Sequence, residues 1–242
     1  MKEKNDKKNI TIGIIGALSE EINLLYKYIK FYKKKIIYNK KFYIGKLKNI
    51  KIILIQSGIG KTSASITCTI LLYVYKIDVI INIGTAGSLS KNMKLGTIVL
   101  PCSTCYHDVD LTPFGYKKGQ VKNFPQIFSI NNYLTKLIET YMIKLNIYYK
   151  KGLIISGDSF IHEKTKKNKL KIHFPEAIAV DMESTAIAQV CYQFNKPFLI
   201  IKTISDHSNN YAALDFQKFS HLASEMLLKI FQYFLHHFYI HE

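Results

Sequence analysis

Two acidic segments near the end of the chain carry the residues best suited to chemistry. Val180-Asp181-Met182-Glu183 forms one of them, and Ser205-Asp206 follows the apolar run Phe198-Leu199-Ile200-Ile201. Each segment ends a run typical of a buried strand, and ligands of α/β proteins bind in the crevice at the carboxyl ends of strands. We therefore expect two strands side by side to deliver Glu183 and Asp206 to one crevice of an enzyme. The alternative role for both carboxylates is capping of the helices that follow.

Two further positions fit both a functional and a structural role. Glu21 lies in the first turn of an expected helix, where the helix dipole stabilises a carboxylate by about 0.3–1 kcal/mol without any catalytic task. Phe160 follows a strand and Gly157, where an exposed ring could stack on a base with about 1–3 kcal/mol. Packing in the core is nevertheless the commoner fate of a phenylalanine. Neither position decides a function alone.

Motifs for nucleotides and metals are incomplete. Gly60-Lys61-Thr62 imitates the end of a P-loop, but Ile55 stands where the earlier glycine is required, and Gly58-x-Gly60 lacks its third glycine. These glycines serve either a close ligand contact or simple turns. The pair Cys102-x-x-Cys105 has no second half-site, and zinc needs four ligands. We expect free thiols, no metal and no cofactor.

The strong positive charge has a compositional origin. The formal net charge is +17, yet all 34 basic residues are lysine, and arginine, which best matches phosphate and guanine, is absent. The densest lysine group, within residues 164–171, spans several helix faces and predicts a solvated surface. Adenine- and thymine-rich coding explains such a composition, so we expect no nucleic-acid partner.

Length and hydropathy predict one domain, residues 1–242, in the cytoplasm. No uncharged run reaches the ~18 apolar residues of a membrane span. The basic start imitates a signal peptide only faintly, since Ser19-Glu20-Glu21 follows and no cleavage site is evident. The lysine-rich residues 1–9 are expected to be disordered.

Alternating strands and helices must position these residues. We expect strands at 11–17, 42–47, 51–56, 78–83, 152–156 and 198–204, and helices at 19–29, 61–75, 130–145, 183–194 and 214–237. The glycine-containing run 84–87 follows the strand at 78–83. Residues 101–128 are irregular and hold three of the five prolines, which is typical of a functional loop. The pattern predicts one sheet between helical layers.

Six segments taken together resemble the bacterial 5′-methylthioadenosine/S-adenosylhomocysteine nucleosidase family. They are IGIIGA at 12–17, SGIGK at 57–61, NIGTAG at 82–87, SGDSFI at 156–161, AVDME at 179–183 and ISD at 204–206. Each is weak alone, and the set in register is specific. The resemblance implies a nucleoside phosphorylase-like α/β fold, a three-layer αβα sandwich with a mixed central sheet. It also implies a homodimer in which a loop completes the neighbour's site.

The resemblance assigns roles by matching motif. Glu21 would be the base that activates water, Asp206 the acid that protonates adenine N7, and Glu183 the group that holds the ribose hydroxyls. The remaining substrate-binding positions are Met182 beside Glu183, Ser205 orienting Asp206, Phe160 and Ile161 at adenine, Thr85, Gly87, and an apolar 5′ pocket of Leu18, Ile59 and Phe216 with Leu111 and Phe114 from the partner.

The implied reaction agrees with elementary chemistry. Breaking an N-glycosidic bond builds oxocarbenium charge on the sugar while the departing base needs a proton, so one base and one acid are the minimum. We expect hydrolysis of methylthioadenosine and S-adenosylhomocysteine, and of 5′-deoxyadenosine, in methionine salvage. Without arginine, phosphorolysis is disfavoured. The alternatives are a nucleosidase for futalosine or AMP, the latter disfavoured by an apolar pocket, and a basic nucleic-acid-binding protein on the same scaffold.

The chain departs from the family pattern at five positions. Leu18 replaces Met, Thr85 replaces Ser, Asp181 replaces Glu, Lys202 replaces Arg, and Lys122 replaces an apolar residue. Lys202 matters most, because a point charge orients its neighbours less rigidly than a guanidinium does. We expect activity to survive with lower efficiency or an altered preference for the 5′ group.

Overall fold

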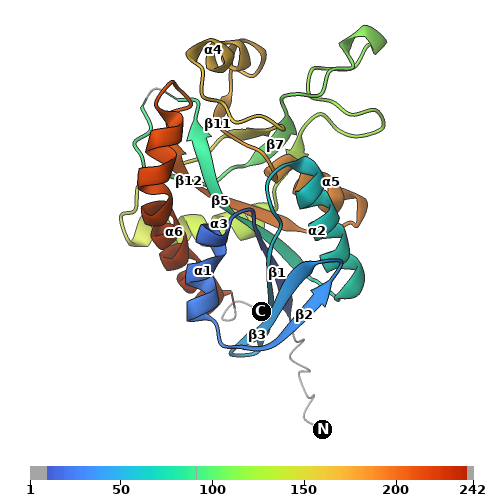
Figure 1. The fold of residues 1–242 in the computed structure, drawn as a ribbon, viewed down its shortest axis with the longest axis vertical. Coiled ribbons are helices and arrows are strands. Elements are labelled where there is room, and N and C mark those ends of the chain that lie inside the picture. The colour runs from blue at the N-terminus through green and yellow to red at the C-terminus, as the bar shows by residue number, and fades with distance from the viewer. Residues whose placement is uncertain (1–9, 91, 239–242) are drawn as a thin grey trace.

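A mixed sheet lies between two layers of helices (Figure 1). The computed structural model describes residues 10–90 and 92–238, and the prediction for residues 1–9 lies outside them. On one side of the sheet lie α1 (Ser19–Tyr28), α3 (Asn132–Lys144) and α6 (Ala212–His237), and on the other lie α2 (Lys61–Val74) and α5 (Ser184–Gln193). A short helix, α4 (Lys164–His173), lies beyond one end of the sheet. The predicted three-layer αβα architecture is confirmed.

The sheet is built around β5. Its main path runs β2-β3-β4-β1-β5-β11-β10-β7-β8, while β12 pairs with β5 and β6, and β6 pairs with β9. The strands are β1 (Thr11–Gly16), β2 (Phe31–Ile37), β3 (Lys40–Leu47), β4 (Ile50–Gln56), β5 (Val79–Ser88), β6 (Ile98–Val99), β7 (Ser103–Tyr106), β8 (Phe128–Ser129), β9 (Tyr149–Lys150), β10 (Leu153–Ser156), β11 (Ala177–Asp181) and β12 (Phe198–Asp206).

The two strands that carry the acidic segments are not neighbours, contrary to the prediction. β12 runs parallel to β5 and places Asp206 opposite Gly87. β11 runs antiparallel to β5 on its other edge and places Val180 opposite the same Gly87. The strands approach from opposite directions, and they meet because β11 pairs only with the last residues of β5. Gly87 therefore marks the point where both acidic segments converge.

β5 continues beyond its predicted end and through the glycine run 84–87. The predicted strand stops at residue 83, whereas β5 extends to Ser88 and includes Gly84 and Gly87. A Cβ on Gly84 would lie 2.6 Å from Glu21 Oε1, and one on Gly87 would lie 2.9 Å from Asp206 Oδ1. Such separations are too short for carbon, so these glycines serve the close approach of side chains rather than a turn.

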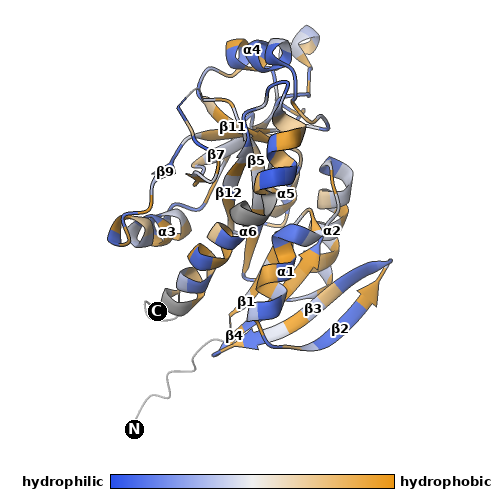
Figure 2. Cartoon of the chain, turned by 60° about the vertical axis from the view of Figure 1, so that its left-hand side comes forward, coloured by the Kyte–Doolittle hydropathy of each residue, from blue (hydrophilic) through white to orange (hydrophobic). Residues whose placement is uncertain are grey.

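Residues 101–128, expected to be irregular, contain β7 and a 3₁₀ turn at 112–114. Among the other elements that were not predicted, two lack an apolar face. β2 has the sequence FYKKKII and is exposed through most of its length at the edge of the sheet. α4 has no buried residue and is almost entirely hydrophilic in Figure 2. Two of its lysines nevertheless bind main-chain carbonyls: Lys167 Nζ donates to Ser88 and His207, and Lys171 Nζ donates to Pro175 and Ala177. The prediction of a purely solvated lysine group is therefore wrong at these two positions.

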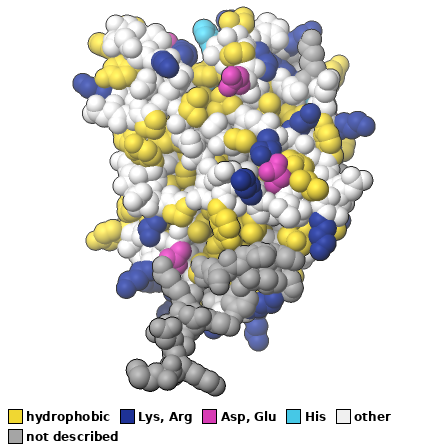
Figure 3. Space-filling model, turned by 180° about the vertical axis from the view of Figure 1, so that it is seen from behind, with side chains coloured by type: hydrophobic (Ala, Val, Ile, Leu, Met, Phe, Trp, Pro, Cys, Tyr) yellow, Lys and Arg dark blue, Asp and Glu magenta, His cyan; other side chains and the backbone are white. Residues whose placement is uncertain are grey.

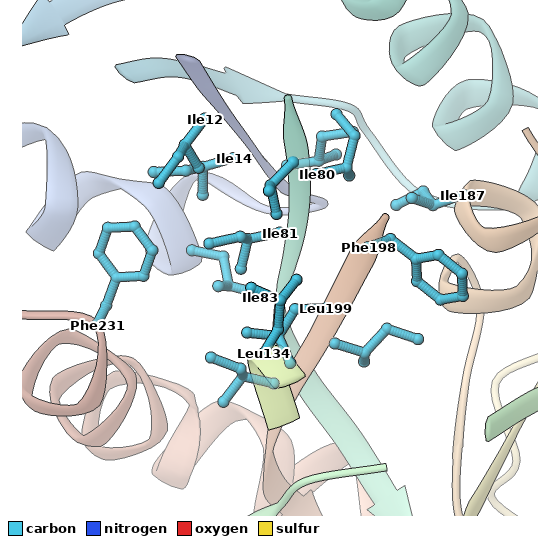
Figure 4. Packing of buried hydrophobic residues seen from close by; sticks show 14 of the residues in the cluster. Ile12, Ile14, Ile80, Ile81, Ile83, Leu134, Ile187, Phe198, Leu199 and Phe231 are labelled. Atoms are coloured by element: carbon cyan, nitrogen blue, oxygen red, sulfur yellow. The ribbon is translucent and has the colours of Figure 1, made fainter. Parts of the chain in front are cut away.

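The core is continuous across both faces of the central strands. Figure 4 shows Ile81 and Ile83 of β5, Leu199 of β12 and Phe231 of α6 in one packed cluster, and all four are almost fully buried. A strand that is covered by helices on both faces has an unbroken run of apolar residues in its sequence, and the first residues of β5, after Asp78, form such a run. Truncating one of these isoleucines to alanine would cost about 2–5 kcal/mol of stability.

The surface shows no continuous basic field on the face seen in Figure 3, where lysines are scattered among apolar and neutral side chains. Within residues 10–90 and 92–238, no helix combines the length and hydropathy needed to cross a membrane.

Candidate active site

A cavity of about 590 Å³ opens where β5, β11 and β12 converge. Glu21, Glu183 and Asp206, which lie far apart in the sequence, all line it. The cavity is also lined by most of the other residues that the resemblance assigns to substrate: Leu18, Ile59, Thr85, Gly87, Phe160, Met182, Ser205 and Phe216. Folding thus gathers the expected carboxylates around one space.

Glu21 is held by four hydrogen bonds. Its Oε2 accepts from the N–H groups of Ala17 and Leu18 at 2.7 and 3.0 Å, and its Oε1 accepts from Thr85 N and Oγ1 at 2.9 and 3.1 Å. Ser19 was expected to be the N-cap of α1. The helix instead begins at Ser19, and Leu18 takes the cap position. The Glu21 carboxylate therefore bridges the start of α1 to β5, at the wall of the cavity.

Glu183 occupies the N-cap position of α5, but its side chain accepts no hydrogen bond from the first N–H groups of that helix. The carboxylate turns into the cavity, where Oε1 accepts from Gly60 N at 2.8 Å. Burial and the neighbouring Asp181 carboxylate raise the pKa of Glu183 to about 7, against the opposing effects of the Lys202 ammonium and the Gly60 N–H. The capping interpretation of Glu183 is wrong.

Asp206 is the last residue of β12 and is almost fully buried. Its Oδ1 accepts from Ser208 N at 2.8 Å and its Oδ2 accepts from Ser205 Oγ at 3.0 Å. Since α6 begins only at Ala212, Asp206 does not cap that helix. Burial raises the pKa of the Asp206 carboxyl, and the two hydrogen bonds oppose the rise only in part. This carboxyl keeps its proton more readily than an aspartic acid in water.

A buried ion pair lies behind the cavity wall. Lys202 Nζ is 2.9 Å from Asp181 Oδ2, and both side chains are 2% exposed. Asp181 Oδ1 also accepts from Ser156 Oγ at 2.6 Å. Burial disfavours the charged ammonium, but the carboxylates of Asp181, Glu21 and Glu183 outweigh it and raise the pKa of Lys202. A lysine inside the apolar strand FLIIKTISD was the sequence signal for this pair.

The opposite wall is apolar and aromatic. The Phe160 ring is 44% exposed and meets Phe216 edge to face, with 6.4 Å between centroids. Ile161 does not line the large cavity and lies instead on an adjoining space of about 30 Å³ with Phe160 and Asp206. The lining residues to which the resemblance assigns no role are Ala17, Ala86, Val180 and Asp181, which lie within the six segments, and Ala213 and Gln217, which lie outside them. Gln217 follows Phe216 on α6, and nothing in its sequence context indicates a site.

Leu111 and Phe114 line neither cavity of their own chain. Leu111 precedes the 3₁₀ turn η1 (Thr112–Phe114) and Phe114 ends it, on a loop that projects from the body of the molecule in Figure 1. Phe114 is 76% exposed. The Phe114 ring is therefore accessible to a second molecule.

The cysteines are free, and Cys102 is exposed whereas Cys105 is buried on β7. The histidine, cysteine and acidic residues in the described part of the chain form no group of three that could hold a metal ion.

Comparisons with known proteins agree over nearly the whole chain. The family model of the phosphorylase superfamily matches residues 11–236. A 5′-methylthioadenosine/S-adenosylhomocysteine nucleosidase from Buchnera aphidicola subsp. Baizongia pistaciae is 53% identical over 223 residues, which is 92% of this chain and 88% of the relative. The crystal structure of S-adenosylhomocysteine nucleosidase from Streptococcus pyogenes with 5-methylthiotubericidin has a TM-score of 0.92 at 32% identity, covering 95% of this chain and 98% of that one.

A second solved structure widens the comparison. Futalosine hydrolase of Helicobacter pylori has a TM-score of 0.90 at 29% identity, covering 94% of this chain and 97% of that one. The fold is therefore shared by enzymes named for different nucleosides, whereas the closer sequence match is to nucleosidases of the first kind. The chain belongs to the phosphorylase superfamily and, within it, to the 5′-methylthioadenosine/S-adenosylhomocysteine nucleosidase family.

Proposed function

We propose that this protein hydrolyses the N-glycosidic bond of 5′-methylthioadenosine and S-adenosylhomocysteine. The products are adenine and either 5-methylthioribose or S-ribosylhomocysteine, which places the reaction in methionine salvage. One observation carries the proposal: Glu21, Glu183 and Asp206 line a single cavity together with the apolar side chains of Leu18, Ile59 and Phe216. Carboxyl groups for the ribose and base and apolar side chains for a thioether match the two parts of these substrates.

Two carboxyl groups share the proton transfers. Glu21, fixed by its four donors, accepts a proton from the attacking water. Asp206, buried and with a raised pKa, gives its proton to adenine N7 as the glycosidic bond breaks, and Ser205 orients it. The bond to the sugar lengthens as positive charge grows at the anomeric carbon, and the Glu21 carboxylate stabilises that charge.

The remaining residues bind and orient the substrate. Glu183, beside Met182, accepts hydrogen bonds from the ribose hydroxyls, which a carboxylate can do with both oxygens. Phe160 stacks on the adenine ring, and the main chain of Ile161 meets its edge. Thr85 and Gly87 line the cavity at the end of β5, where the absence of a Cβ at Gly87 lets the Asp206 carboxyl approach the strand. Leu18, Ile59 and Phe216 surround the 5′-thioalkyl group.

Water is favoured over phosphate as the second substrate. The described residues that line the cavity include four carboxyl groups, Glu21, Asp181, Glu183 and Asp206, and no lysine or arginine. A phosphate dianion would find no cationic or bidentate donor in this lining. The same lack of a cation disfavours the 5′-phosphate of AMP, whereas 5′-deoxyadenosine fits apolar 5′ surroundings.

We also propose that the protein is a homodimer of single-domain subunits in the cytoplasm. In this arrangement Leu111 and Phe114 of one subunit close the 5′ pocket of the other. Support comes from the projecting loop, from the 76% exposure of Phe114 and from the open apolar wall at Ile59, which is 57% exposed.

Adenine release tests the function directly. Purified protein is incubated with methylthioadenosine, S-adenosylhomocysteine, 5′-deoxyadenosine, futalosine or AMP, each with and without phosphate. We expect adenine from the first three substrates at rates that phosphate leaves unchanged. No release, or release only with phosphate, would reject the proposal, and faster release of hypoxanthine from futalosine would replace it by the futalosine alternative.

A further inference from the structure

Three loops around the cavity are tied together by a cluster of charged residues that does not line it. Lys61 N donates to Asp158 Oδ1 at 2.7 Å, while Lys61 Nζ lies 2.7 Å from Asp108 Oδ2 and 4.0 Å from Asp158 Oδ2. Asp158 N closes the triangle by donating to Asp108 Oδ2 at 2.9 Å. We call Lys61, Asp108 and Asp158 the Lys61 clamp.

Each arm of the clamp leads to a different part of the proposed site. The residue before Lys61 is Gly60, whose N–H donates to Glu183 at 2.8 Å. Two residues after Asp158 comes Phe160, the exposed ring at the cavity. Asp108 begins the projecting loop that carries the turn η1. The clamp thus joins the ribose side, the adenine side and the projecting loop.

The clamp is packed tightly enough to transmit a displacement. A Cβ on Gly60 would lie 2.9 Å from Asp158 Oδ1, and one on Gly157 would lie 2.8 Å from Asp108 Cγ and 2.5 Å from the His107 ring. The Lys61 ammonium also lies 5.3 Å from the centroid of the Tyr106 ring. Asp158 therefore lies directly against Gly60, and Asp108 directly against Gly157, so a shift of either carboxylate toward its glycine displaces that loop.

We propose that Lys61 is a positioning residue that aligns Gly60 with Glu183 and sets the place of the Phe160 ring, and that it links both to the projecting loop through Asp108. The inference rests on the proposed function of this cavity. Its importance is not stability, because the side chains of Lys61 and Asp108 are each 25% exposed and ion pairs of that kind add little to folding.

The expected signature is a change in KM with little change in kcat. Glu183 and Phe160 bind groups that are present in both the ground state and the transition state, so weakening them removes uniform binding. Glu21 and Asp206 are held by separate hydrogen bonds to Thr85, Ser205 and Ser208, which the clamp does not touch. A variant that merely unfolds in part would instead lose active enzyme, so that kcat would fall at constant KM.

The test compares Lys61→Met and Lys61→Arg with Lys151→Met, which removes the ion pair between Lys151 and Glu139 (3.0 Å) away from the cavity. We expect Lys61→Met to raise KM for methylthioadenosine about tenfold with kcat within about threefold of wild type. Lys61→Arg should restore most of the affinity, and Lys151→Met should leave both constants unchanged. Unchanged KM in Lys61→Met, or an equal effect of Lys151→Met, would overturn the inference.

A second measurement does not depend on turnover or on one variant folding. The affinity of adenine alone is measured by calorimetry for wild type, Lys61→Met, the isosteric Asp108→Asn and the double variant. Each single variant should weaken adenine binding severalfold, and the double variant should be no weaker than Lys61→Met. Additive losses would show that the two residues act independently and would overturn the clamp. Wild-type protein that binds adenine but releases none from methylthioadenosine would reject the proposed function and leave the clamp standing.

Discussion

At the scale of single residues, the surroundings of each carboxyl group indicate which one acts as base and which as acid. The residue types alone do not distinguish these two roles. Glu21 accepts four hydrogen bonds, which immobilise it as an acceptor. Asp206 is buried with a raised pKa and faces the same cavity. Pairs of titratable groups whose environments differ in this way are the usual mark of a base and an acid.

Replacing Asp206 by asparagine should abolish turnover while leaving the fold intact. The amide keeps the size of the side chain but cannot transfer a proton to the leaving base, and such transfers contribute about 10²–10⁴-fold to rate. Adenine release by Asp206→Asn is measured beside thermal unfolding followed by circular dichroism. An undiminished rate in a folded variant would remove the acid role.

Glu183 should make stability depend on pH between about 4.5 and 7. Its pKa rises from 4.5 to about 7 on folding, so the folded state binds more protons than the unfolded state in this window. Its contribution to the free energy of unfolding therefore falls as pH rises through the window. Relative to wild type, Glu183→Gln should gain about 1–3 kcal/mol between pH 4.5 and 8. Denaturant unfolding at four pH values checks this, and parallel profiles would contradict it.

At the scale of elements, the site depends on where backbones approach side chains. β5 must pass directly behind the Glu21 carboxylate for Thr85 to donate to it, and only a glycine at position 84 allows that approach. α1 must begin at Ser19 so that the N–H groups of Ala17 and Leu18 point at the other carboxylate oxygen. Strand and helix therefore hold the proposed base jointly.

Gly84→Ala should lower kcat about 100-fold. The new Cβ would lie 2.6 Å from Glu21 Oε1, so the carboxylate or β5 must move, and displacements of about 1 Å cost that much in rate. Gly152→Ala is the matched control, since its Cβ would meet only the side chain of Ile178 at 3.0–3.1 Å. Steady-state kinetics of both variants decide the matter, and equal activity would contradict the role of Gly84.

At the scale of the whole molecule, the proposed site is open on the side from which a second subunit would complete it. Ile59 at the cavity mouth and Phe114 on the projecting loop are both more than half exposed. Both side chains are therefore accessible to the second subunit of the proposed dimer.

Phe114→Ser should raise KM for methylthioadenosine about tenfold, because the 5′ group would lose an apolar contact worth roughly 1.5–3 kcal/mol when fully buried. Sedimentation equilibrium of wild type and variant reports the dimer, and KM reports the pocket. The exposed Tyr148, remote from the loop, provides the control Tyr148→Ser. A wild-type monomer with full activity would refute the completed pocket.

Much of the fold could be predicted because local signals and topology agree. The hairpin β3–β4, the helices α2 and α3 and the buried strand β12 follow from apolar patterns and turn residues. β2 and α4 were not predicted, because both are rich in lysine and show no apolar periodicity. The extension of β5 beyond residue 83 was not predicted, because a glycine run also suits a turn. Only the side chains packed against these glycines show that they belong to the strand.

The sequence by itself determined which residue types were available and in what order: three carboxylates after apolar runs, glycines near them, and no arginine to hold phosphate. Only the tertiary structure decided that β11 and β12 approach Gly87 from opposite directions, that Glu183 accepts from Gly60 rather than capping α5, and that Lys202 pairs with Asp181. The reason is physical. Propensity and periodicity act over a few residues, whereas strand pairing, burial and the pKa of a carboxyl depend on groups that lie up to hundreds of residues apart.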